Sequence, residues 1–249
     1  MEFRRCFPVA RAFFSILAAS ATALSLVLGA CQTPPPPAPS PAYDYTQPVP
    51  EGDLLGDDWF DNTAIIGHSL MEGFEGFSGI NADVHYFTAT GLSAAGTTGY
   101  SKFKLPNGGR GTLKKGLEQQ QFDKVYIMLG TNEITTSKDR YKSNMTAILD
   151  VVRETQGDDI PIYILNATPT TKKKSDSTPF NLKNITKLNE AIAELCEEQE
   201  CYLVDLYSCF ADEDGYLPAK NSTDGVHLVA SQYKVMANYI LSHTVEEPK

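Results

Sequence analysis

Short apolar runs alternate with longer amphipathic segments from residue 53 onward. The short runs have the length and the β-branched or aromatic content of strands. The expected strands are Thr63–Gly67, Asp83–Phe87, Lys124–Leu129, Pro161–Leu165 and Tyr202–Leu206. The longer segments repeat apolar residues at three- and four-residue steps, which is the spacing of a buried helix face. The expected helices are Leu70–Phe77, Thr112–Gln120, Ser137–Thr155, Asn181–Glu198 and Val229–His243. This alternation predicts an α/β domain whose parallel sheet is covered by helices on both faces.

The stretch NTAIIGHSLMEGF, residues 62–74, predicts a buried strand, a sharp turn and the start of a helix. Gly67 is expected to supply the backbone angles of that turn. Ser69 then lies at a helix N-terminus, on the rim of the sheet. A serine in that position is most often an N-cap, and the alternative is a nucleophile.

Other chemically useful residues follow the ends of other expected strands: Gly91, Asn132, Asp224 and His227. Acyl transfer through a serine needs a base, a group that orients the base, and donors for the oxyanion. His227 and Asp224 can supply the first two across a turn, and Asn132 with backbone N–H groups of Ser69 and Gly91 can supply the third. Each residue also has an ordinary reading as a turn, cap or loop residue, but together they favour a site at the carboxyl edge of the sheet.

These residues fall into four ordered segments: Gly67-His68-Ser69, Gly91, Gly130-Thr131-Asn132 and Asp224-Gly225-Val226-His227. They resemble the four blocks of the SGNH, or GDSL, hydrolase family, over residues 67–227. The resemblance implies a flavodoxin-like, three-layer α/β/α fold with a five-stranded parallel sheet. It also implies an esterase in which Ser69 is the nucleophile, His227 the base and Asp224 its orienting partner. Ser69, Gly91 and Asn132 would then form the oxyanion hole, with no cofactor or metal.

His68 departs from the family pattern, which usually has Asp before the serine. We expect a structural substitution that points away from Ser69 and changes the hydrogen bonds beneath the turn. The alternative is that His68 perturbs the site or marks lost activity. His85, in the second strand, is expected to pack against its neighbours or lie at an edge.

The amino terminus predicts export. Arginines precede an apolar run that ends at Gly29-Ala30-Cys31, so residues 1–30 have the layout of a signal peptide and Cys31 that of a lipidated cysteine. An ordinary signal peptide or an uncleaved anchor are the alternatives. Residues 31–52 contain eight prolines and predict an extended tether, leaving 53–249 as the hydrolase domain. The protein is thus expected to be a bacterial lipoprotein at the cell surface or facing the periplasm.

The charge of the chain bears on its expected partners, and its cysteines bear on an expected disulfide. Residues 1–30 carry three arginines and one glutamate, so the rest of the chain has a formal net charge of -12, against -10 for the whole. This disfavours nucleic acid, and the basic run Lys172–Lys174 is expected in a solvated loop. Among the remaining cysteines, Cys196 and Cys201 are expected to pair and Cys209 to stay free.

These features together predict a lipid-anchored serine esterase that removes a short acyl group, with acetyl expected, from a carbohydrate or cell-envelope substrate. Transfer of the same acyl group to a sugar hydroxyl is one alternative. A non-catalytic lipoprotein that binds a glycan or partner is the other. The oligomeric state does not follow from the sequence.

Overall fold

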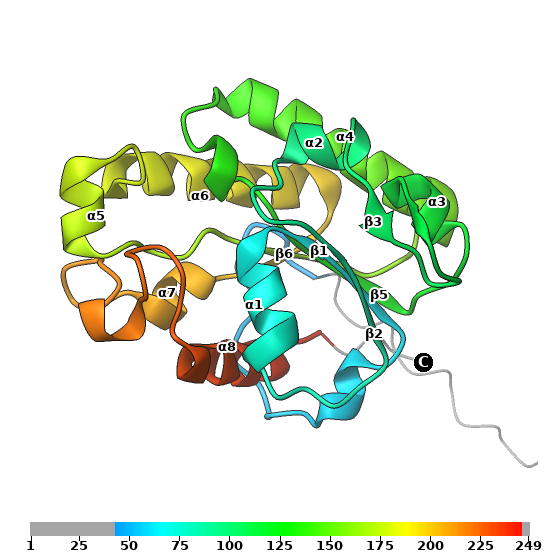
Figure 1. The fold of residues 1–249 in the computed structure, drawn as a ribbon, viewed down its shortest axis with the longest axis horizontal. Coiled ribbons are helices and arrows are strands. Elements are labelled where there is room, and N and C mark those ends of the chain that lie inside the picture. Colours follow the sequence, from blue (N-terminus) through cyan, green and yellow to red (C-terminus); the bar gives the residue numbers. More distant parts are fainter. Residues whose placement is uncertain (1–42, 246–249) are drawn as a thin grey trace, which may run out of the picture. The chain divides into compact units, whose positions relative to one another are not determined.

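A parallel five-stranded sheet organises the computed structural model, which describes residues 43–245 (Figure 1). Its strands are β2 (Val84–Thr88), β1 (Thr63–Gly67), β5 (Lys124–Met128), β6 (Ile162–Leu165) and β7 (Tyr202–Val204), in that spatial order. Numbered by sheet strand alone, the order is 2-1-3-4-5, as in flavodoxin-like folds, and it reverses beside β1. The predicted fold class is therefore confirmed, and Ser69 follows the strand at the reversal point.

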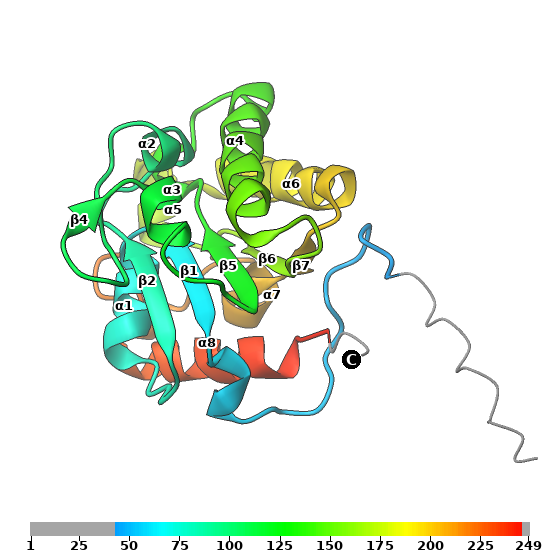
Figure 2. The same cartoon turned by 90° about the vertical axis from the view of Figure 1, so that its right-hand side faces the viewer.

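Helices cover both faces of this sheet, so the molecule has three layers (Figures 1 and 2). Alternate residues of β1 face opposite layers: Ala64 and Ile66 belong to one buried cluster and Ile65 to the other. The first cluster includes residues of α2 (Ala94–Thr98), α3 (Leu113–Leu117), α4 (Lys138–Gln156) and α6 (Leu182–Gln199). The second includes residues of α1 (Ser69–Phe77), α7 (Leu206–Phe210) and α8 (Ala230–Ser242).

All five expected strands and all five expected helices are present, with small differences at their ends. The short elements were not predicted: α2, α5 (Lys172–Ser177), α7, the hairpin β3 (Phe103–Lys104) and β4 (Arg110–Gly111), and the 3-10 turns η1 (Asp57–Phe60), η2 (Thr131–Glu133) and η3 (Ala219–Asn221). The basic run was wrongly expected in a loop. It forms the first turn of α5, because the Thr171 side chain caps that helix by accepting the Lys174 N–H.

The folded region begins earlier than the expected boundary at residue 53. Val49 is buried, and its N–H donates to Leu203 O of the edge strand β7 at 2.8 Å. The rings of Tyr43 and Tyr45 lie 4.9 and 5.4 Å from that of Tyr202. Aromatic and apolar side chains among the prolines therefore attach the last ten residues of the expected tether to the domain.

The expected signal peptide, the lipidation site Cys31 and the first part of the tether lie outside the described residues. Within residues 43–245, no helix has both the length and the apolar character needed to cross a membrane.

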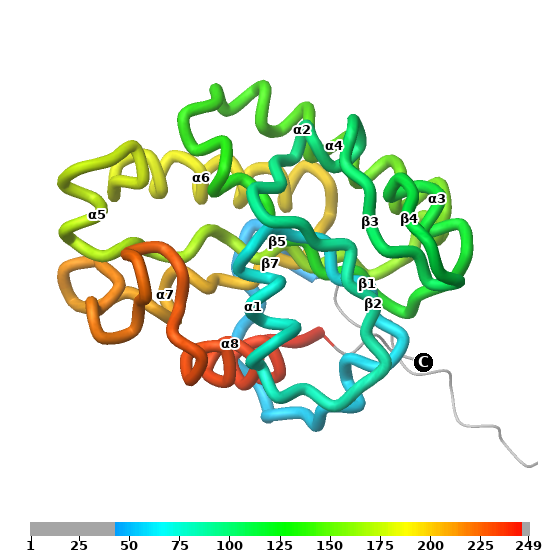
Figure 3. Tube along the Cα trace, in the orientation of Figure 1, coloured from blue at the N-terminus to red at the C-terminus, as the bar shows by residue number. Residues whose placement is uncertain are grey.

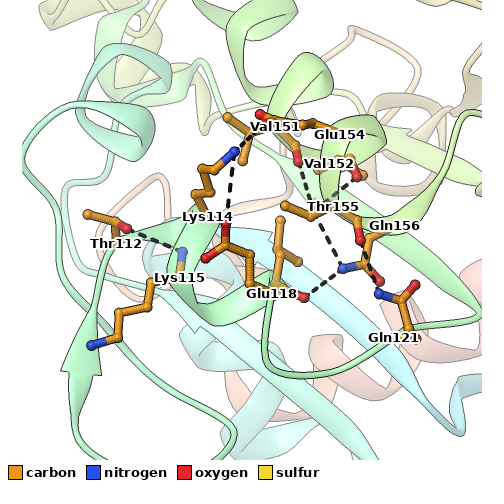
Figure 4. A network of polar contacts seen from close by, with 11 residues as sticks. Thr112, Lys114, Lys115, Glu118, Gln121, Val151, Val152, Glu154, Thr155 and Gln156 are labelled. Atoms are coloured by element: carbon orange, nitrogen blue, oxygen red, sulfur yellow. Dashed lines mark hydrogen bonds and ion pairs between the residues drawn. The ribbon is translucent and has the colours of Figure 1, made fainter.

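Side-chain bonds fasten the C-terminal end of α4 to α3 (Figure 4). Lys114 forms ion pairs with Glu118 and Glu154. The Gln156 amide donates to Leu117 O at 2.8 Å and accepts the Phe122 N–H at 2.8 Å. These bonds join α3 to the end of α4 and to the segment that enters β5.

The three described cysteines are free thiols, so the expected pair of Cys196 and Cys201 is not found. Both residues are buried, where the Cys201 N–H donates to Cys196 O at 3.0 Å. Burial raises the pKa of the Cys201 thiol to about 11. Cys209 is partly exposed.

Candidate active site

Ser69 is the first residue of α1, two residues beyond the end of β1. A side chain at Gly67 would collide with Met71, since its Cβ would lie 2.4 Å from Met71 Cγ. Gly67 is not among the residues with positive φ, so crowding explains this glycine and the expected turn geometry does not. The cap of α1 is His68, whose Nδ1 accepts the Leu70 N–H at 3.3 Å. The Ser69 hydroxyl is therefore not used as a helix cap.

Ser69, His227 and Asp224 form one hydrogen-bonded chain. Ser69 Oγ lies 2.8 Å from His227 Nε2, and His227 Nδ1 lies 2.8 Å from Asp224 Oδ2. Asp224 Oδ1 accepts the backbone N–H groups of Val226 and His227 at 2.9 and 2.8 Å. Partial burial raises the pKa of Asp224, but these bonds outweigh it and lower the pKa to about 2. The ionised carboxylate favours the imidazole tautomer with its proton on Nδ1, which leaves Nε2 as the acceptor for the serine proton.

The histidine reaches the serine only because the chain crosses the carboxyl edge of the sheet after β7. β5 and β6 lie between β7 and β1, and the returning segment is visible between α7 and α8 (Figure 3). Backbone bonds attach this segment to the loop after β6: Thr171 N–H donates to Gly225 O, and Leu217 N–H to Thr170 O, each at 3.0 Å.

Packing of α8 on α1 completes the approach. Tyr233 of α8 lies so close to Gly73 of α1 that a Cβ there would be 2.2 Å from the tyrosine Cζ and hydroxyl. Gly73 therefore lets the helix that follows His227 dock on the helix that begins with Ser69.

Three N–H groups at this edge can serve an oxyanion. Ser69 N–H, at a helix start, and Gly91 N–H form no hydrogen bond within residues 43–245. Gly91 is the third residue of a tight turn closed by Leu92 N–H and Ala89 O at 3.1 Å, and its φ of 72° requires glycine. Asn132 Nδ2 donates to Leu92 O at 3.0 Å, which occupies one of its two hydrogens.

Sheet order places these donors around the serine. Gly91 follows β2 and Asn132 follows β5, and those two strands flank β1. A Cβ at Gly91 would meet no atom within 4 Å, so the space beside this turn is open to a ligand.

His68 is buried beneath the nucleophile turn, with 2% of its surface exposed. Burial and the neighbouring His227 lower the pKa of His68 to about 4, so its ring is neutral at pH 7. Its Nδ1 supplies the acceptor that caps α1, and its Nε2 is a buried atom with no hydrogen-bond partner among the described residues. This geometry agrees with the structural substitution expected at residue 68. His85, also expected to be structural, packs on Phe87 and contacts Lys104 O at 3.0 Å through Nε2.

Residues that hold the Gly91 turn were missed in the sequence. Glu133 accepts the Ala94 N–H at 2.6 Å, and Glu72 accepts the Thr90 hydroxyl at 2.7 Å. The only sequence signal for Glu133 is its place directly after Asn132. Within the described chain, no group of three or more His, Cys, Asp or Glu residues could hold a metal ion.

Comparisons with known proteins identify the family of this chain. The sequence model of the GDSL-like Lipase/Acylhydrolase family matches residues 65–235, which include all the residues of the triad and the three donors. The chain belongs to this family, and it is a serine esterase of the SGNH/GDSL type. A search of curated proteins found no match.

Solved structures show the same fold at low sequence identity. An acetyl xylan esterase, AlAXEase, is 14% identical with a TM-score of 0.57, over 74% of this chain and all of that one. An acetyl-xylooligosaccharide esterase from Geobacillus Stearmophilus is 13% identical with a TM-score of 0.55, over 77% of this chain and 96% of that one. A GDSL-like lipase from Bacteroides thetaiotaomicron is 13% identical with a TM-score of 0.52, over 72% and 84% of the two chains.

Proposed function

We propose that this protein removes a short acyl group, acetyl in particular, from a carbohydrate or cell-envelope ester. The observation that carries the proposal is the hydrogen-bonded chain from Ser69 Oγ through His227 to Asp224, with both links at 2.8 Å. Such a chain lets a neutral imidazole take the serine proton as the hydroxyl attacks an ester carbonyl.

The proposed reaction has two halves. Ser69 Oγ bonds to the carbonyl carbon while its proton moves to His227 Nε2, and the carbonyl oxygen becomes an anion facing the N–H groups of Ser69, Gly91 and Asn132. Collapse breaks the bond to the alcohol, which leaves with the proton from His227. Water then attacks the acyl-serine, again giving its proton to His227, and releases the carboxylic acid and the free serine.

Exposure of the triad supports hydrolysis and a polar substrate. The side chain of His227 is 39% exposed to solvent and that of Asp224 is 49% exposed, so the site lies open to water. Open access favours water over a sugar hydroxyl as the acyl acceptor, because a transferase must keep water away from the acyl-enzyme. The names of two similar structures, an acetyl xylan esterase and an acetyl-xylooligosaccharide esterase, support acetylated sugars as the first substrates to try.

Hydrolysis of an ester panel by residues 43–249 tests this proposal. The panel contains aryl acetate, butyrate and octanoate esters, acetylated xylooligosaccharides and an acetylated peptidoglycan fragment. We expect the highest kcat/KM among acetyl esters, with turnover lost in Ser69→Ala and retained in Ser78→Ala, a serine at the other end of α1. Turnover by Ser69→Ala would refute a serine esterase, and a preference for octanoate would refute the short-acyl assignment.

We also propose that Cys31 is lipidated and that the protein is exported and held at a membrane by this lipid. The support is the sequence order: an apolar run, Gly29-Ala30, Cys31 and then a proline-rich tether. Expression of the full chain with Cys31→Ala tests this, because the variant should leave the membrane fraction. Lipid-dependent partitioning that persists in the variant would contradict the assignment.

A further inference from the structure

The loop that carries Gly91, here called the Gly91 loop (residues 89–93), is fastened to the elements on both sides of it. Toward α1, the Thr90 hydroxyl donates to Glu72 Oε2 at 2.7 Å. Toward η2, Leu92 O accepts from Asn132 Nδ2 at 3.0 Å. These bonds involve the residues immediately before and after Gly91.

A third bond holds the junction between this loop and α2. Glu133 Oε1 accepts the N–H of Ala94, whose side chain is fully buried in the core. Glu133 is itself half-buried, whereas the bond between Thr90 and Glu72 is exposed. Water therefore competes less with the Glu133 bond, and losing it would leave a buried N–H without a partner.

Asn132 and Glu133 together hold the loop more firmly than either bond alone. They are consecutive residues of η2, and they engage a carbonyl and an N–H group two residues apart, Leu92 O and Ala94 N. A single bond would let the loop pivot about it. Two bonds to the same short backbone segment prevent that rotation.

We propose that Glu133 is a positioning residue for the oxyanion hole: its carboxylate fixes the Gly91 loop against Asn132, so that the Gly91 N–H and the second Asn132 amide hydrogen point at one oxygen. This inference rests on the proposed ester hydrolysis. Glu133 forms no hydrogen bond with Ser69 or His227, so its proposed effect is on the geometry of the two donors.

Loss of this bond should affect turnover more than substrate binding, because the donors meet a developing negative charge only during reaction. A shift of about 1 Å at a catalytic group costs on the order of a hundredfold in rate. We therefore expect Glu133→Ala to lower kcat by roughly ten- to a hundredfold, with KM changed by less than about threefold.

Two further substitutions separate reach from charge. Glu133→Gln keeps an oxygen at the same distance but loses the charge, and Glu133→Asp keeps the charge but is one methylene shorter. If the reach of the oxygen to the Ala94 N–H decides the effect, kcat of the Gln variant stays within about threefold of the wild type. In that case kcat of the Asp variant falls as far as kcat of the Ala variant. Glu190→Ala is the matched control. Glu190 and Glu133 both line a cavity of about 540 Å³, but Glu190 makes no bond to the Gly91 loop.

The measurements are kcat and KM for one aryl acetate and the urea midpoint of every variant. The inference is overturned if Glu133→Ala keeps kcat within twofold of the wild type, if Gln loses as much as Ala, or if the loss appears in KM alone. A lowered urea midpoint with unchanged kcat in the folded protein also overturns it. If the wild type shows no turnover that depends on Ser69, the proposed function itself fails, so the two failures are distinguishable.

Discussion

The stability of this protein should fall on mild acidification because of a single buried imidazole. His68 is 2% exposed and its pKa is lowered from 6.5 to about 4, first by burial and then by the charge of nearby His227. The unfolded chain therefore binds a proton more readily than the folded one. The contribution of the neutral His68 ring to the free energy of unfolding is fully present above about pH 6.5. It is lost as the pH falls toward about 4.

The size of this effect follows from the two pKa values. Their separation corresponds to a total of about 3 kcal/mol, at about 1.4 kcal/mol per pKa unit. Between about pH 7 and about pH 5, roughly 2 kcal/mol of this should be lost. Replacement of His68 by Asn removes the titrating group and keeps an acceptor for the Leu70 N–H.

Urea unfolding at about pH 7, 6 and 5 measures this difference. We expect the wild type to lose about 2 kcal/mol more than His68→Asn over that range. Asn181→Ala is the control. It removes the N-cap of α6, a side chain that does not ionise and that accepts the Asn184 N–H. This substitution should lower the free energy of unfolding by about 1 kcal/mol at every pH. Equal acid losses in the wild type and His68→Asn would refute the reasoning.

Three further predictions concern the site and its supports. Gly73→Ala should weaken the docking of α8 on α1 because its Cβ would overlap Tyr233; we expect a lower urea midpoint and reduced kcat, and an unchanged midpoint would contradict the role given to this contact. Gly91→Ala should cost about 1–2 kcal/mol of stability, as a left-handed φ strains alanine while no neighbour opposes its methyl group; a stabilised variant would count against this. Thiol titration of residues 43–249 should label three thiols after unfolding but mainly Cys209 in the native protein, since the other two are buried; finding one thiol after unfolding would instead indicate a disulfide.

The sequence by itself predicted the long elements and the candidate residues of the site. Apolar periodicity is a local property, so it located the parallel sheet strands and the long helices to within a few residues. The order of the four segments around Ser69, Gly91, Asn132 and His227 was equally readable, because each stands next to the end of an expected element. Short elements such as α5 escaped because one or two capping bonds decide them, as at Thr171.

Only the tertiary structure decided how those residues meet. Asp224 and His227 follow an edge strand that lies away from β1, and nothing local to their sequence specifies the return of the chain to Ser69. Likewise, Gly67 and Gly73 are small because of side chains that approach them, Met71 and Tyr233, and not because of their own backbone angles. Periodicity records which face of an element is buried, whereas the partner that covers it is set by packing between segments distant in the chain.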